Sequence, residues 1–166
     1  MGKGIVILVL ATLFLFSPCL AVAQQAIFLV RHGEAVAAKG DARPLSEAGQ
    51  QRAALLAKLL KDAGIKAIFT SGIERTIKTA EPLAQTLRIE PKTLSQLNVP
   101  GFKQSDVDAF VAFLRAEHRE DIVLLVGHTG TVPALLKALG HPVEIKIPET
   151  EFDNLFVLIP KPTAPQ

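Results

Sequence analysis

Three short, almost wholly apolar runs most strongly constrain the fold of this chain: Ala26–Val30, Ala67–Thr70 and Ile122–Val126. A short run without alternating polar residues is typical of a strand buried on both faces. Strands of that kind belong to parallel sheets that carry helices on both sides. The chain is therefore expected to fold around a mostly parallel sheet.

Helical periodicity appears between and after these runs in four segments: Ser46–Asp62, Ile73–Leu87, Val107–His118 and Thr131–Leu139. Ser46 is the expected N-cap of the first helix, and Gly64 is expected to stop it. Its predicted apolar face consists of Ala48, Leu55, Leu56, Leu59 and Leu60. Pro82 is expected to kink the second helix or to start a new segment there.

Further strands are predicted over Ile89–Leu94, Val143–Ile147 and Leu155–Ile159. Pro91 favours an edge or a turn for the first of these. Alternating strands and helices predict an α/β fold, a single three-layer α/β/α domain with a mostly parallel central sheet. The length of 166 residues suits one such domain.

The N-terminal segment has the three-part order of a secretory signal. Lys3 gives a basic start, Ile5–Phe16 is apolar apart from Thr12, and Ala21-Val22-Ala23 offers small residues to a signal peptidase. We expect residues 1–23 to be removed, residues 24–160 to form the domain and residues 161–166 to be a flexible Pro-rich tail. The product would be secreted or periplasmic, without stable membrane association. An uncleaved membrane anchor is the alternative, because the apolar stretch approaches spanning length.

Composition argues against two classes of protein. The chain has 18 basic and 16 acidic residues, a net charge of +2, so no bulk charge would attract nucleic acid. Its one cysteine, Cys19, lies in the predicted leader, which excludes a disulfide scaffold. A mature chain without cysteine suits an oxidising compartment.

Polar residues follow each of the three apolar runs. Arg31-His32-Gly33-Glu34 follows the first, Ser71-Gly72 with Arg75 follows the second, and Gly127-His128-Thr129-Gly130 follows the third. The carboxyl ends of parallel strands meet at one edge of a sheet, so two arginines and two histidines are expected to converge there. Such a cluster is costly unless an anion fills it, and guanidinium groups suit phosphate. The sequence therefore predicts a phosphate site.

The histidines do not indicate a metal site. No two of them have the i, i+4 spacing of ligands on one helix, and the neighbouring arginines would repel a divalent cation. His118 ends an amphipathic helix, and His141 lies in the turn Gly140-His141-Pro142, so both are interpreted as structural or solvated. We expect neither a metal nor another cofactor.

Taken in order, these motifs resemble the histidine phosphatase superfamily, which has the phosphoglycerate mutase-like fold. The matching parts are Arg31-His32-Gly33-Glu34, Arg43-Pro44-Leu45-Ser46 with Gly49, Thr70–Thr76 with Thr79-Ala80-Glu81, and Gly127-His128. The short chain, without a long lid insertion, is most similar to the small phosphohistidine-phosphatase-like branch. The predicted leader departs from the cytoplasmic members of that branch, so their substrate is not carried over.

The resemblance implies catalysis through a phosphohistidine on His32. The other ring N–H of His32 should donate to a backbone carbonyl, which leaves the attacking nitrogen neutral. Arg31 and Arg75 would hold the phosphoryl oxygens, and His128 would be a further donor, without any metal. The remaining candidates for phosphate contacts are Arg43, Gly33 and Thr129.

The resemblance leaves the proton donor to the leaving group open. Many relatives place a Glu in a segment that here reads Leu94–Asn98, with Gln96 in its place, and an amide cannot serve as an acid. Glu34 and Asp41 are the catalytic substitutes, although Glu34 could instead pair with an Arg and Asp41 could only form a turn. We therefore expect good leaving groups, as in phosphoramidates, acyl phosphates and aryl phosphates.

Three functions are compatible with these features. The first is an exported, metal-independent phosphatase that acts on phosphate monoesters or phosphoramidates, in a small molecule or a phosphoprotein. The second is a phosphoglycerate-mutase-like phosphotransferase. The third is a non-catalytic module that binds phosphate or phosphoglycan. His32 and His128 favour catalysis, because arginines and amides alone would suffice for binding.

Overall fold

The computed structural model describes residues 26–37, 43–94 and 102–160. The predicted leader, Asp41, Gln96 and the C-terminal tail lie outside these ranges. No helix in the described ranges has both the length and the hydropathy to cross a bilayer.

Five strands and four helices follow one another in the described chain. Their order is β1 (Ala26–Arg31), α1 (Glu47–Leu60), β2 (Ile65–Thr70), α2 (Glu74–Leu87), β3 (Lys92–Thr93), α3 (Gln104–Glu117), β4 (Ile122–Gly127), α4 (Thr131–Ala138) and β5 (Leu155–Leu158). The strands form one sheet in the order β3-β2-β4-β1-β5, in which only β5 is antiparallel to its neighbour.

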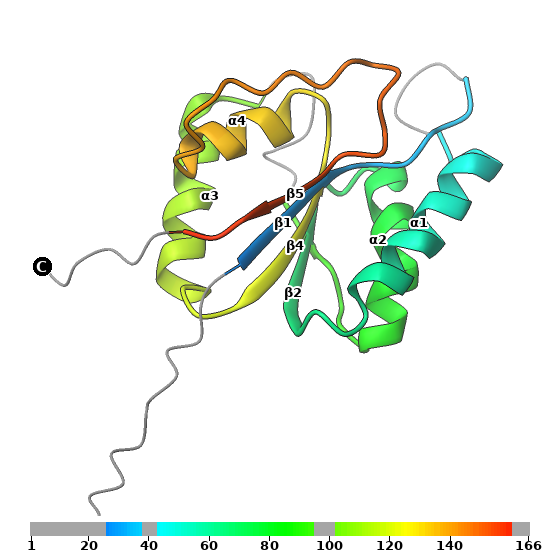
Figure 1. Cartoon of the computed structure of the whole chain (residues 1–166), viewed down its shortest axis with the longest axis horizontal. Helices are drawn as coiled ribbons and strands as arrows, with labels where there is room; N and C mark the ends of the chain where they lie inside the picture. Colours follow the sequence, from blue (N-terminus) through cyan, green and yellow to red (C-terminus); the bar gives the residue numbers. More distant parts are fainter. Residues whose placement is uncertain (1–25, 38–42, 95–101, 161–166) are drawn as a thin grey trace, which may run out of the picture.

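Helices cover both faces of this sheet, with α1 and α2 on one side and α3 and α4 on the other (Figure 1). Strand β1 shows why its sequence is wholly apolar. Ile27 and Leu29 enter the core beneath α3 and α4, whereas Phe28 and Val30 pack toward α1 and α2. Both faces of the strand therefore lose contact with water, and the predicted three-layer α/β/α architecture with a mostly parallel sheet is confirmed.

Helix α1 begins as predicted, because the Ser46 hydroxyl accepts a 3.2 Å hydrogen bond from the Gly49 N–H. Its predicted apolar face was only partly right. Leu55 and Leu59 are 52% and 61% exposed, and Ala48 is exposed as well. The buried stripe instead consists of Gly49, Ala53, Leu56, Ala57 and Leu60. Small side chains on this stripe let α1 lie close to its neighbours, which turns two leucines toward solvent.

Two further predictions need correction. Helix α2 continues through Pro82, so no new segment starts there, and Ala80, Leu83 and Ala84 on either side of the proline are buried in the core. The segment Val143–Ile147 alternates like a strand but forms none, although Ile147 is buried. The predicted strand over Leu155–Ile159 does form, as β5, and pairs with β1.

Candidate active site

The strand register brings the three polar motifs to one edge of the sheet. Arg31 lies opposite Gly127 in the β1–β4 ladder, and Thr70 lies opposite Val126 in the β2–β4 ladder. The backbone N–H of His32 then donates a 3.0 Å hydrogen bond to the carbonyl of Gly127. The residues that follow β1, β2 and β4 consequently lie side by side.

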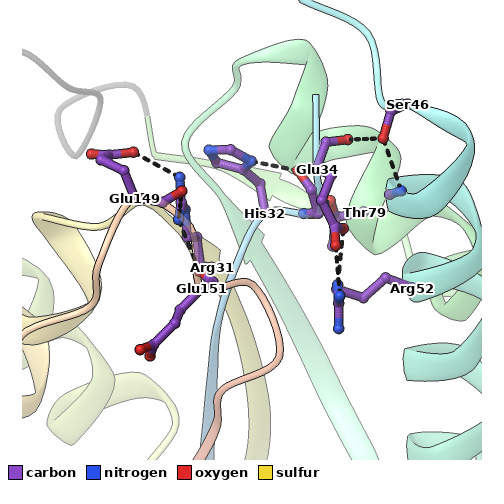
Figure 2. Close-up of polar contacts among 10 residues, drawn as sticks. Arg31, His32, Glu34, Ser46, Arg52, Thr79, Glu149 and Glu151 are labelled. Atoms are coloured by element: carbon purple, nitrogen blue, oxygen red, sulfur yellow. Dashed lines mark hydrogen bonds and ion pairs between the residues drawn. The ribbon is translucent and has the colours of Figure 1, made fainter. Parts of the chain in front are cut away.

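His32 is held with one nitrogen protonated and the other free of a proton. Its Nδ1 atom lies 2.7 Å from the carbonyl oxygen of Gly33, which can only accept, so Nδ1 carries the hydrogen (Figure 2). Its Nε2 atom accepts a 3.1 Å hydrogen bond from Nε of Arg75. Nε2 therefore carries the lone pair, as the expected carbonyl contact requires.

The surroundings keep His32 neutral. Burial is the largest cause that lowers the pKa of His32, to about 4, and the positive charges of Arg75, Arg31 and Arg43 act in the same direction. The hydrogen bond to the Gly33 carbonyl opposes this shift. At neutral pH the Nε2 lone pair is thus available.

His128 faces His32 in an edge-to-face arrangement, with ring centroids 5.2 Å apart. Burial lowers its pKa to about 3, helped by His32 and by the charges of Arg75, Arg31 and Arg43. Its Nε2 atom lies 2.8 Å from the Ser71 hydroxyl. A second buried neutral imidazole therefore lies beside His32.

Arg31 is fixed along one edge by the loop before β5. Its Nη1 atom donates to the carbonyls of Pro148, Glu149 and Glu151 at 2.8–3.1 Å. The guanidinium also lies 3.9 Å from the centre of the Phe152 ring. Its Nε atom is buried and has no hydrogen-bond partner among the described residues. The side chain is thus held in place, with one donor that finds no acceptor among the described residues.

Glu149 joins this arginine to a second candidate residue. Its carboxylate pairs with Nη2 of Arg31 at 2.8 Å (Figure 2). It also accepts a 3.0 Å hydrogen bond from the Thr129 hydroxyl. Glu149 is nonetheless 81% exposed. The sequence did not single it out, because no local pattern relates residues 118 positions apart.

The backbone of Gly33 lies against other parts of the protein, so its lack of a side chain does not leave room for a ligand there. Its N–H donates to the Thr79 hydroxyl at 2.9 Å, and a Cβ atom there would lie 2.9 Å from the Gly49 carbonyl oxygen. A Cβ atom on Gly49 would in turn collide with the carbonyl of Glu34. The two glycines thus seat the loop after β1 on the first turn of α1. Arg43, half-buried after that loop, keeps a buried Nε without a partner in the described chain.

Glu34 is engaged in an ion pair that points away from His32 (Figure 2). Its two carboxylate oxygens accept hydrogen bonds from Arg52, at 2.6 Å from Nη2 and 2.9 Å from Nε. The hydrogen bond from Arg52 is the main cause that holds the pKa of Glu34 below its ordinary value. Glu34 is therefore ionised at neutral pH in this arrangement. Asp41, the other candidate acid, lies outside the described residues.

Comparison with known proteins agrees with this geometry. The model of the histidine phosphatase superfamily (branch 1) matches residues 27–98, which include Arg31, His32 and Arg75. The solved structure of the protein histidine phosphatase SixA complexed with tungstate is 26% identical, with a TM-score of 0.64 over 74% of this chain and 82% of that one. Residues 27–98 belong to the histidine phosphatase superfamily, and the described chain has the fold of its members.

Other superfamily members extend the comparison. Probable phosphoglycerate mutase GpmB of Photorhabdus laumondii subsp. laumondii is 31% identical over 97 residues. That match covers 52% of this chain and 44% of GpmB, so this histidine phosphatase homologue spans less than half of that relative. Mycobacterial glucosyl-3-phosphoglycerate phosphatase shares the fold at 20% identity, with a TM-score of 0.58 over 69% of this chain and 78% of that one.

Proposed function

We propose that this protein is an exported phosphatase that hydrolyses phosphate monoesters or phosphoramidates through a phosphohistidine on His32. The observation that carries the proposal is the state of His32. The Gly33 carbonyl holds its Nδ1 proton, and its Nε2 lone pair faces the arginine cluster. A buried neutral imidazole beside a cluster of arginines suits attack on phosphorus.

The proposed reaction consists of two displacements. Nε2 of His32 attacks phosphorus, the bond to the leaving oxygen or nitrogen breaks, and the leaving group takes the electron pair and, where it needs one, a proton from solvent. Water then attacks the phosphohistidine, the P–N bond breaks, and inorganic phosphate leaves. Arg75 and the Nε–H of Arg31 supply positive charge to the equatorial oxygens in both transition states. Fixed guanidinium groups thus take the part that a metal ion plays in other phosphatases.

The leaving group is expected to be a good one. Glu34 is bound to Arg52 and ionised, so it has no proton to give in this arrangement. Phosphoramidates, acyl phosphates and aryl phosphates need less help from an acid than alkyl phosphates do. The protein histidine phosphatase among the relatives acts on a phosphoramidate by its name, which supports this substrate class.

A phosphotransferase is the second candidate, because one relative is named a probable phosphoglycerate mutase. A mutase would return the phosphoryl group from His32 to a second hydroxyl, whereas a phosphatase would release it to water. The ratio of released phosphate to transferred phosphate therefore separates the two functions.

A substrate panel tests the proposal. Purified protein, with a chelator present, would be given p-nitrophenyl phosphate, an acyl phosphate, a phosphoramidate and simple alkyl phosphates, with phosphate release measured. We expect turnover of the first three and much slower release from the alkyl esters. Equal rates on alkyl and aryl phosphates would contradict the leaving-group argument. Tight phosphate binding without turnover would instead indicate a binding module.

Export rests on the sequence of residues 1–23 and has its own experiment. The full chain would be expressed in a Gram-negative host, and the mature protein in the periplasmic fraction would be sequenced from its N-terminus. We expect Gln24 as the first residue. Recovery of the uncut chain in the membrane fraction would favour the anchor instead.

A further inference from the structure

We propose that Ser71 and Thr76 act as positioning residues that fix the tautomer of His128, with its hydrogen on Nε2 and its lone pair on Nδ1. The tautomer follows from hydrogen bonds within the protein. Its use in phosphoryl transfer rests on the proposed function.

The hydroxyl of Thr76 is the fixed end of this chain. Its Oγ1 atom lies 2.8 Å from the carbonyl oxygen of Ile73, which can only accept a hydrogen bond. Thr76 therefore donates its single hydroxyl hydrogen to that carbonyl. Its side chain has no exposed surface, so bulk water does not compete for this hydrogen.

Ser71 is the middle of the chain, and its direction follows. Its Oγ atom lies 3.1 Å from Oγ1 of Thr76 and 2.8 Å from Nε2 of His128, and its single hydrogen serves one of these contacts. Because the hydrogen of Thr76 is already used, all three contacts are hydrogen bonds only if Ser71 donates to Thr76. The Ser71 oxygen is then left only with acceptor capacity. It lies 2.8 Å from Nε2 of His128, and Nε2 must therefore carry the hydrogen.

The two histidines of the site consequently have opposite tautomers. His32 carries its hydrogen on Nδ1 and presents Nε2 as a lone pair. His128 carries its hydrogen on Nε2, which donates a hydrogen bond to the Ser71 oxygen. Its Nδ1 atom is the ring nitrogen that remains for a ligand. The first arrangement prepares a nucleophile, and the second leaves an acceptor beside it.

This acceptor has a consequence for phosphate binding. A neutral His128 with a bare Nδ1 would repel an oxyanion, so it must gain a proton before it can donate to one. The charged and titratable groups that act on it are His32, Arg75, Arg31 and Arg43, all of which oppose that proton. An incoming anion reverses the balance, and His128 then takes up one proton from solvent together with the anion.

The tautomer can be read directly from ¹⁵N chemical shifts of the imidazole nitrogens in the mature protein. His128→Gln identifies the signals by removing them. We expect a protonated Nε2 and a bare Nδ1 in the wild type. Thr76→Val, which is nearly isosteric, frees the Ser71 hydrogen to donate to Nε2 and should shift His128 toward the Nδ1–H form. Thr76→Ser should restore the wild-type pattern.

Binding of tungstate, which stays a dianion near neutral pH, tests the proton uptake. The affinity of the wild type should rise as the pH falls from 8 to 6, by up to about tenfold for each pH unit, which is the limit for linkage to one proton. In Thr76→Val the tungstate affinity should depend less on pH, because Nδ1 of His128 already carries a hydrogen in that variant.

Three results would overturn the inference: an Nδ1–H tautomer in the wild type, an unchanged tautomer in Thr76→Val, or a wild-type affinity for tungstate that does not depend on pH. A protein with the expected tautomers but no phosphatase activity would sink the proposed function and leave the tautomer assignment standing.

Discussion

Nε of Arg75 donates a 3.1 Å hydrogen bond to Nε2 of His32, the lone pair that attacks phosphorus in the proposed mechanism. Arg75 thus occupies the lone pair of the nitrogen that is proposed to attack phosphorus. When a phosphoryl group approaches Nε2, this donor must pass from the imidazole to a phosphoryl oxygen. One side chain therefore orients the nucleophile first and stabilises the developing charge afterwards.

Removal of Arg75 should therefore be costly for catalysis. Arg75→Ala is expected to lose about 2–4 kcal/mol of transition-state stabilisation, the scale for a preorganised charge donor. Steady-state kcat/KM on p-nitrophenyl phosphate measures this loss. Lys78→Ala, an exposed change on the same helix, is the matched control. A loss of less than about tenfold, or about 1.4 kcal/mol, would place Arg75 outside the reaction.

Glu149 competes with the substrate for Arg31. Glu149→Gln should lower KM, and the Kd for tungstate, by about two- to fivefold, because an exposed ion pair is worth less than about 1 kcal/mol. Glu151→Gln is the control, since only the backbone carbonyl of Glu151 contacts Arg31. Weaker tungstate binding in Glu149→Gln would mean that the carboxylate assists the substrate instead.

The ion pair of Glu34 separates a structural role from an acidic one. If Glu34 only holds Arg52, Glu34→Gln and Arg52→Gln should lower the free energy of unfolding alike and change kcat similarly on aryl and alkyl phosphates. Urea denaturation and kinetics on both substrate classes measure this. A loss confined to alkyl phosphates, and seen in Glu34→Gln but not in Arg52→Gln, would show that Glu34 donates a proton.

Much of the fold could be predicted because the strands buried on both faces are recognisable in the sequence as short runs of apolar residues. β1 and β4 are apolar on every residue up to their ends, and the parallel register then places His32 beside His128. The alternation of apolar and polar residues over Val143–Ile147 led to a wrong strand prediction. A pattern of period two indicates which side chains are buried, but it does not show whether a neighbouring strand is present to pair with. Ile147 is buried there without any ladder.

The missing parts of the site are contacts between distant segments. Nothing local in the sequence indicates that Glu149 pairs with Arg31, or that Arg52 holds Glu34. Leu55 and Leu59 were placed on the buried face because leucine is more apolar than alanine or glycine. Close packing in fact selects the small residues Gly49 and Ala53 for that face. The distance between α1 and its neighbours decides which residues of the helix are buried, and the sequence does not give that distance.

The buried histidines should make the protein less stable in mild acid. Burial lowers the pKa of His32 to about 4 and of His128 to about 3, whereas both sit near 6.5 in the unfolded chain. Between pH 6.5 and 4.5 the unfolded state therefore binds more protons, so stability is full above pH 6.5 and falls as the pH drops. Each histidine contributes up to about 1.4 kcal/mol per pH unit.

Urea unfolding at several pH values measures this loss. His128→Gln should reduce the slope of stability against pH, because one of the two buried groups is removed. His141→Gln, a change outside the site, should keep the wild-type slope. An unchanged slope in His128→Gln would mean that His128 is not buried as a neutral group.

The most direct test of the account is whether phosphate becomes bound to His32. Protein mixed with a ³²P-labelled substrate would be quenched rapidly without acid and separated from free label, and the stability of the bound label would be measured. The account predicts label on the wild type that is lost in acid and kept in base, and no label on His32→Ala. Turnover by a wild type that carries no label, or equal labelling of His32→Ala, would contradict the covalent role of His32.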